Sequence, residues 1–192
     1  MDVDQRAAFD LLIRNKAVQM AADLELGTAL NLNFLPSAAL NPETSLCLTI
    51  EAAEHGFPAE QIIFEATETE FIDDLPGFAE TIKQGQRYGF QLAVDDFGAG
   101  NAGLGMLADF QPDYVKMDVA LVRDIESKGP RQAIARAVSL LCEELGMSLV
   151  AEGVETIAEY RWLRQLGICL FQGFLFAKHM FEGRPLVRYP KD

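Results

Sequence analysis

The chain has 192 residues, of which 49% are hydrophobic and 23% charged, a composition typical of a soluble globular domain with a real core. Its net charge of -13 argues against a protein that binds duplex nucleic acid through a broad basic face. No apolar run reaches the roughly 18 residues of a membrane span. The start of the chain also lacks the pattern of a signal peptide. We therefore expect a cytoplasmic protein with no membrane segment.

Three cysteines, Cys47, Cys142 and Cys169, lie in apolar surroundings without metal-ligand spacing. Buried thiols in a reducing cytoplasm are the expected state. The two histidines, His55 and His179, are isolated and are expected to be surface or structural residues rather than ligands.

Apolar residues recur every three or four positions from Phe9 through Ile13 to Leu24, which predicts an amphipathic helix with these side chains on one face. Short apolar runs then predict six strands, at 30–34, 61–65, 91–94, 114–118, 148–152 and 169–172. Helices are predicted at 42–56, around 78–82, at 134–146 and at 156–167. Leu170 and Phe171 on the last strand are expected to pack in the core.

The predicted strands start 21 to 34 residues apart, which is the length of a strand-helix unit. Strands that alternate with helices at this interval predict a parallel sheet and an α/β fold. The regular repeat favours a TIM-like (β/α)8 barrel over an open dinucleotide-binding sheet, because no glycine-rich turn follows the first strand. A complete barrel has eight strands in about 250 residues. We therefore expect residues 1–192 to form a single partial domain that lacks the first two strands.

The functional prediction begins from the stretch between Gln91 and Gly100. Its apolar run ends in two adjacent carboxylates, Asp95 and Asp96, before a glycine-containing turn. Such carboxylates repel each other unless a cation lies between them, and a hard ion such as Mg²⁺ would suit them. One of them could instead cap the next helix while the other faces water.

Polar groups end every predicted strand, and in a barrel these ends meet on the face that holds active sites. The residues concerned are Asn33, Glu65, Asp95, Asp96, Lys116, Asp118, Glu152 and Gln172. Oxygen ligands of this kind predict a site for Mg²⁺, Mn²⁺ or Ca²⁺. Two such metals could polarise a phosphodiester and activate water. Alternatively, the site could stabilise an enolate with Lys116 as the base.

Six segments, in order, resemble the EAL domain family of bacterial cyclic di-GMP phosphodiesterases. They are Asn31-Leu-Asn-Phe-Leu-Pro36, Phe64-Glu-Ala-Thr-Glu68, Val94-Asp-Asp-Phe-Gly-Ala-Gly100, Val115-Lys-Met-Asp118, Val150-Ala-Glu-Gly-Val-Glu-Thr156 and Phe171-Gln-Gly173. The Asp-Asp-Phe-Gly stretch alone would also suit a kinase, but the glycine-rich loop and the His-Arg-Asp loop of kinases are absent. The resemblance implies hydrolysis of cyclic di-GMP to linear pGpG with two Mg²⁺ or Mn²⁺ ions.

The resemblance also implies a role for each matching residue. Asn33, Glu65 and Asp95 would bind the first metal, and Asp95 would bridge to a second one near Asp96 and Asp118. Lys116 would lie beside the attacking water, and Glu152 would act as general base or second-metal ligand. Glu155, Gln172 and Pro36 would lie on the substrate side. Glu68 would hold the loop after Asp96, which in this family couples metal binding to dimer contacts, so a homodimer is expected. The resemblance also implies an attached sensor domain.

Two departures from the family pattern leave alternatives open. The Glu-Ala-Leu signature, with one metal ligand, is absent from the sequence, and Ala99 stands where the family often has threonine. The chain is therefore either a fragment of an active phosphodiesterase or a degenerate domain. The main alternative to the enzyme is an inactive cyclic di-GMP receptor or protein-interaction module.

Overall fold

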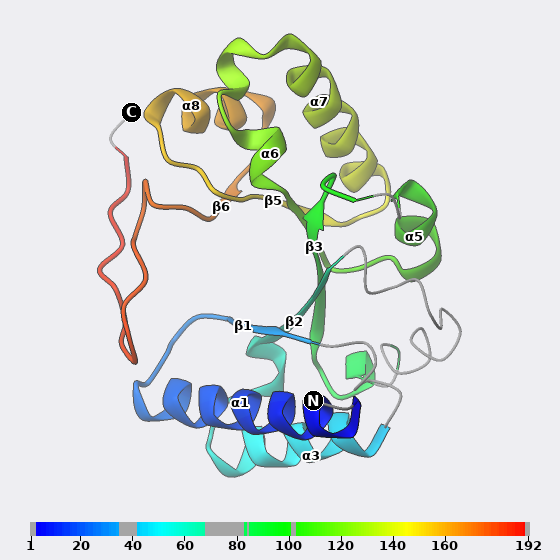
Figure 1. Cartoon of the computed structure of the whole chain (residues 1–192), viewed down its shortest axis with the longest axis vertical. Helices are drawn as coiled ribbons and strands as arrows, with labels where there is room; N and C mark the ends of the chain where they lie inside the picture. The colour runs from blue at the N-terminus through cyan, green and yellow to red at the C-terminus, as the bar shows by residue number, and fades with distance from the viewer. Residues whose placement is uncertain (1–2, 35–41, 68–82, 84, 101–102, 191–192) are drawn as a thin grey trace. The chain divides into compact units, whose positions relative to one another are not determined.

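The computed structural model describes residues 3–34, 42–67, 83, 85–100 and 103–190 (Figure 1). The chain forms two compact units, Met1–Ala93 and Val94–Asp192. Six strands follow one another in the sheet in chain order, β1 to β6. This order is the one expected from repeated strand-helix units. Among the described residues, no helix is both long and apolar enough to cross a membrane.

The first unit packs two helices side by side against its strands (Figure 1). Its elements are α1 (Val3–Asp23), β1 (Leu30–Asn33), α3 (Pro42–Glu54), the 3-10 helix η1 (Ala59–Gln61) and β2 (Ile62–Thr67). Strands β1 and β2 are parallel and place Asn33 opposite Glu65. The predicted strands at 30–34 and 61–65 are thus confirmed, whereas the helix predicted around 78–82 lies outside the described residues.

Helix α1 turns a different face inward from the one its apolar pattern predicts. Phe9 is 56% exposed and Ile13 49% exposed, while Arg14 is buried. The Arg14 guanidinium forms an ion pair with Asp10 at 2.5 Å and lies over the ring of Phe34, 5.0 Å from its centroid. An aromatic ring attracts a cation, so this arginine can pack inside where an apolar side chain was expected.

The second unit continues the alternation of strands and helices. Its elements are β3 (Gln91–Phe97, which begins in the first unit), α5 (Gly103–Phe110), β4 (Tyr114–Met117), α6 (Val119–Val122), the 3-10 helix η3 (Ile125–Ser127), α7 (Gly129–Glu144), β5 (Ser148–Ala151), α8 (Ile157–Leu166) and β6 (Leu170–Phe171). Strands β4, β5 and β6 pair in parallel, as predicted. The short helices α5 and α6 were not predicted.

The core of the second unit lies between β4, β5 and the helices that follow them. Met117 and Ala151 from the strands pack with Ile125 and Leu163 from η3 and α8. Phe171 lies against this core and forms an edge contact with the Tyr160 ring, with 5.0 Å between centroids. Its neighbour Leu170 is 41% exposed, so the expectation that both residues pack in the core is correct only for Phe171.

Candidate metal and active site

The two carboxylates of β3 end a buried stretch of strand. Leu92 and Val94 are fully covered, whereas Asp95 is half-buried and Asp96 exposed. Asp96 has a φ of +54°, and its backbone N–H donates to Oδ1 of Asp95 at 2.9 Å. This left-handed residue interrupts the extended backbone near the carboxyl end of β3, where both carboxylates lie.

Lys116 joins this pair to a third carboxylate. It lies on β4 with only 2% of its surface exposed. Its Nζ is 3.1 Å from Asp95 Oδ1 and 2.8 Å from Glu152 Oε1. Glu152 directly follows β5, and its N–H donates to the Met117 carbonyl at 3.2 Å. The register of two parallel strands thus brings the Lys116 and Glu152 side chains together.

Asp95, Asp96 and Glu152 each offer a carboxylate oxygen within 4.8 Å of the others. Burial raises the pKa of Glu152 to about 7, against the opposing effect of Lys116 and with a further contribution from Asp95. The pKa of Asp96 is also raised, by burial and by the charges of Asp95 and Asp118. Three carboxylates lie around the single ammonium group of Lys116, so this ammonium group does not balance their charge when all three are ionised. Three converging oxygen donors with surplus charge fit a hard divalent cation.

Asp118 serves as the N-cap of α6. Its Oδ1 accepts a hydrogen bond from the Ala120 N–H at 2.8 Å. Its own N–H donates to the Phe97 carbonyl at 3.2 Å, which ties it to the end of β3. Asp118 is therefore a helix cap whose charge reaches Asp96, and its oxygens are not among the three that converge.

In the first unit, a different asparagine contacts the predicted ligand Glu65. Asn33 lies opposite Glu65 in the strand register, but the Nδ2 of Asn31 donates to Glu65 Oε1 at 2.6 Å. Residues two apart on a strand share one face, so Asn31 and Asn33 both lie on the Glu65 side. The strand alternation could have indicated Asn31 from the sequence.

The predicted substrate-side residues Glu155 and Gln172 line one small hollow of about 220 Å³, together with Phe174 and His179. Glu155 is also ion-paired, at 2.8 Å, with Arg123. The turn after Gln172 needs glycine, because a Cβ at Gly173 would lie 2.1 Å from the Val154 carbonyl oxygen. The two other predicted site residues, Pro36 and Glu68, lie outside the described residues.

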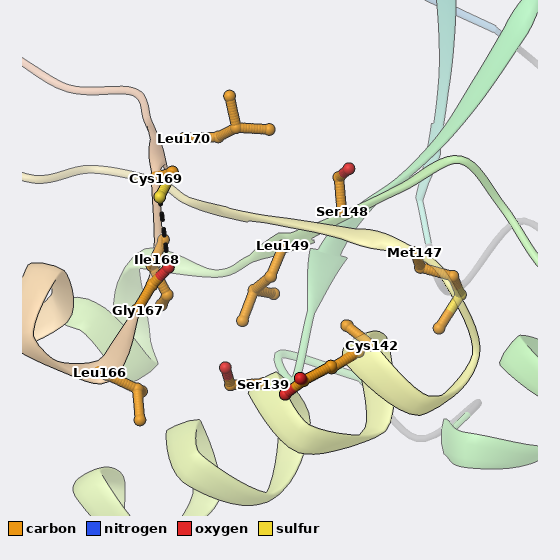
Figure 2. Close-up of a pocket in the computed structure, with 11 residues that line it drawn as sticks. Ser139, Cys142, Met147, Ser148, Leu149, Leu166, Gly167, Ile168, Cys169 and Leu170 are labelled. Atoms are coloured by element: carbon orange, nitrogen blue, oxygen red, sulfur yellow. Dashed lines mark hydrogen bonds between the residues drawn. The ribbon is translucent and has the colours of Figure 1, made fainter.

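A larger cavity, of about 470 Å³, lies at the other end of the strands (Figure 2). It is bordered by α7 and by the residues that start β5 and β6, including Cys142, Ser148 and Cys169. None of the predicted site residues lines it. Cys142 is buried as expected, but Cys169 is exposed, contrary to the sequence-based expectation. The side chain of Cys47 is outside the described part of the chain.

Comparison with known proteins relates the chain to one family. A family model described as "EAL domain" matches residues 2–179. The blue light- and temperature-regulated antirepressor BluF of Escherichia coli is 41% identical over 184 residues, which are 95% of this chain and 46% of BluF. The cyclic di-GMP phosphodiesterase RocR of Pseudomonas aeruginosa is 34% identical over 172 residues, which are 90% of this chain and 43% of RocR. The chain thus spans less than half the length of these relatives.

Solved structures agree with this relationship. Klebsiella pneumoniae BlrP1 in complex with calcium and cyclic di-GMP has a TM-score of 0.92 and 41% identity, covering 97% of this chain and 48% of BlrP1. The complex of BlrP1 with manganese and cyclic di-GMP has a TM-score of 0.88 and also 41% identity. The predicted fold class, α/β of the TIM-like EAL type, is therefore confirmed.

Proposed function

Because this chain belongs to the EAL domain family, we propose that it is a phosphodiesterase domain that hydrolyses cyclic di-GMP to linear pGpG. The observation that supports this most is the Lys116 ammonium between Asp95 and Glu152, with Asp96 beside them. Named phosphodiesterases such as RocR are among the relatives, and BlrP1 binds cyclic di-GMP in its solved complexes.

The proposed cofactor is Mg²⁺ or Mn²⁺, and a two-metal site is the arrangement we favour. Asp95, Asp96 and Glu152 would hold it in the second unit, and Asn33, Glu65 and Asp118 are further ligands proposed from the family resemblance. When bound, such ions neutralise phosphodiester charge and lower the pKa of a coordinated water.

The residues of the chain have separate tasks in this proposal. Lys116 fixes the Asp95 and Glu152 carboxylates and supplies a positive charge beside the scissile phosphate, where negative charge develops. The Glu152 carboxylate accepts a proton from the attacking water. Glu155, Gln172 and Pro36 contact the substrate, and Glu68 holds the loop after Asp96.

A second candidate function is a catalytically inactive cyclic di-GMP receptor or protein-interaction module, and one observation favours it. BluF, 41% identical to this chain, is named an antirepressor rather than a phosphodiesterase. For either function we propose that residues 1–192 form part of one EAL domain in a cytoplasmic homodimer, regulated by an attached sensor domain.

The test is incubation with cyclic di-GMP and Mn²⁺ or Mg²⁺, followed by chromatography of the products. We expect linear pGpG from the chain, or from the full-length protein that contains it. Asp95→Asn should abolish turnover while the fold survives, because it removes a charge shared by Lys116 and the metal site. Phe171→Ala is the control: it should lower stability by about 3 kcal/mol through lost packing and leave the chemistry intact.

Near-normal hydrolysis by Asp95→Asn would contradict the metal assignment. If the wild-type protein instead binds cyclic di-GMP and releases no product, the receptor function is the correct one.

A further inference from the structure

Glu159, in the first turn of α8, is a charged side chain with only 1% of its surface exposed. Its Oε2 accepts hydrogen bonds from the backbone N–H groups of Glu155, at 3.0 Å, and Thr156, at 2.9 Å. Its Oε1 accepts one from the N–H of Asp124, also at 3.0 Å. One carboxylate thus binds three backbone amides, each by a charge-assisted hydrogen bond.

Helix capping explains only part of this arrangement. Thr156 and Glu159 form a capping box, in which each side chain binds the backbone N–H of the other residue. A capping box needs nothing beyond its own helix end. The bond to Asp124 reaches a segment 35 residues earlier in the sequence, so Glu159 also joins two separate parts of the unit.

The two segments that Glu159 joins are the loops that follow β4 and β5. The first begins at Asp118, includes the single-turn helix α6 and continues to Asp124, while the second begins at Glu152 and ends at Thr156. Asp124 has a left-handed φ of +54°, and its N–H donates to Glu159. These loops carry two of the proposed site carboxylates, Asp118 and Glu152.

Other contacts between the same loops surround this connection. Gly153 lies so close to α6 that a Cβ there would be 2.5 Å from Val119 Cγ2. The Arg123 guanidinium pairs with Glu155 at 2.8 Å and lies 3.8 Å from Glu159 Oε1. The Arg123–Glu155 pair is exposed and contributes little on its own. The buried carboxylate is therefore the main polar connection between the loops.

We propose that Glu159 is a positioning residue for the candidate metal site: its carboxylate fixes the loop that bears Glu152 against the loop that bears Asp118. This inference rests on the proposed function. Glu159 does not contact the site, and it acts through the backbone of the two loops. Loss of the connection would let the Glu152 oxygens move relative to Asp95, which a divalent ion with short ligand distances tolerates poorly.

The test compares two variants of the full chain. Glu159→Gln keeps one acceptor oxygen and replaces the other with an NH₂ group, which cannot accept a hydrogen bond. The variant therefore loses the bonds to one of the two loops. Thr156→Ala is the matched control, because it removes the side chain that accepts from the Glu159 N–H at 3.2 Å and keeps the carboxylate. If Glu159→Gln fails to fold, Glu159→Asp replaces it, since it keeps the charge but shortens the reach.

Three quantities are measured: the affinity for Mn²⁺ by calorimetry, the hydrogen exchange of the Asp124 amide, and kcat and KM for cyclic di-GMP. We expect Glu159→Gln to bind Mn²⁺ at least about 10-fold more weakly than the wild type, because changing a residue that orients metal ligands commonly lowers metal affinity by this much. We also expect faster Asp124 exchange and a kcat that falls more than KM changes. Thr156→Ala should lose stability but keep wild-type Mn²⁺ affinity.

Equal Mn²⁺ affinity in Glu159→Gln and Thr156→Ala would overturn the positioning role, even if the wild type hydrolyses cyclic di-GMP. A wild type that binds Mn²⁺ without hydrolysis would overturn the proposed phosphodiesterase, while weaker Mn²⁺ binding by Glu159→Gln would still support the positioning role. A wild type that binds no Mn²⁺ would contradict both.

Discussion

At the scale of single residues, two buried glutamates near the same loop have opposite electrostatic settings. Glu152 lies beside other carboxylates, and burial together with Asp95 raises its pKa to about 7. Burial acts in the same direction on Glu159, but backbone hydrogen bonds from Glu155, Asp124 and Thr156 outweigh it and hold its pKa below the ordinary value. Both carboxyl groups are buried, so the difference in pKa comes from their neighbours: carboxylates beside Glu152, which favour a bound cation, and backbone N–H groups around Glu159, which favour a structural role.

The two described thiols should also differ in reactivity, because one is buried and the other is exposed. Burial raises the pKa of Cys142 to about 11, so almost no thiolate exists there near pH 8. Cys169 is exposed, and its Sγ lies 3.8 Å from the Arg164 Nη1. Treatment of the folded protein with iodoacetamide should label Cys169 well before Cys142, as peptide mass spectrometry would show.

Unfolding in denaturant is the control for this labelling, since it should make the two thiols react at similar rates. Early labelling of Cys142 in the folded protein would mean that the space between α7 and β5 opens to solvent.

At the scale of elements, the strands could be predicted from sequence because each is a short apolar run that ends in a polar residue. The runs at 91–94 and 148–152 predicted the positions of Asp95 and Glu152. The parallel register of β4 and β5 brings Glu152 to Lys116, and Asp95, on the neighbouring strand β3, also contacts Lys116. Helix α6 was missed because Val119–Val122 is a single turn, too short to show a helical period.

Residues that act through tertiary contacts were also missed. Glu159 looks like an ordinary helix-cap residue in the sequence, because its bond to Asp124 depends on how two distant loops meet. Asn31 was also missed, although the alternation of the strand puts it on the same face as Asn33; its hydrogen bond to Glu65 depends on how β1 and β2 pair.

Helix α1 gives an element-scale prediction, because its buried face is not its most apolar one. Val18 is fully buried and Leu12 is 63% exposed. Leu12→Gln should therefore change the free energy of unfolding by less than about 0.5 kcal/mol. Val18→Ala should cost roughly 1–2 kcal/mol, since it removes two buried carbons. Urea unfolding of both variants measures the difference, and a larger loss for Leu12→Gln would show that the apolar face of α1 is covered in solution.

At the scale of the whole molecule, the net charge of -13 poses a problem for a protein proposed to bind an anionic dinucleotide. Repulsion between the ligand and this charge must be overcome locally. The Lys116 ammonium lies among the carboxylates of the candidate site, and its positive charge is already opposed by Asp95 and Glu152. Bound divalent metal is therefore the natural source of the missing positive charge.

If divalent metal supplies this charge, Mn²⁺ should stabilise the whole protein. A ligand that binds only the folded state adds about 2.7 kcal/mol when its concentration is 100 times Kd. For a chain of this length, that is roughly 5 to 10 °C in Tm. Scanning calorimetry with and without Mn²⁺ should show this rise, and Asp95→Asn should remove most of it, because Asp95 is one of the three converging donors.

General screening of an acidic protein by any divalent ion is the competing explanation for such a rise. Glu144→Gln is the matched control, because it also removes one negative charge, from an exposed position on α7 outside the carboxylate group. Under screening, the two variants would respond to Mn²⁺ alike. A response that persists in Glu144→Gln and disappears in Asp95→Asn assigns the stabilisation to the carboxylates around Lys116.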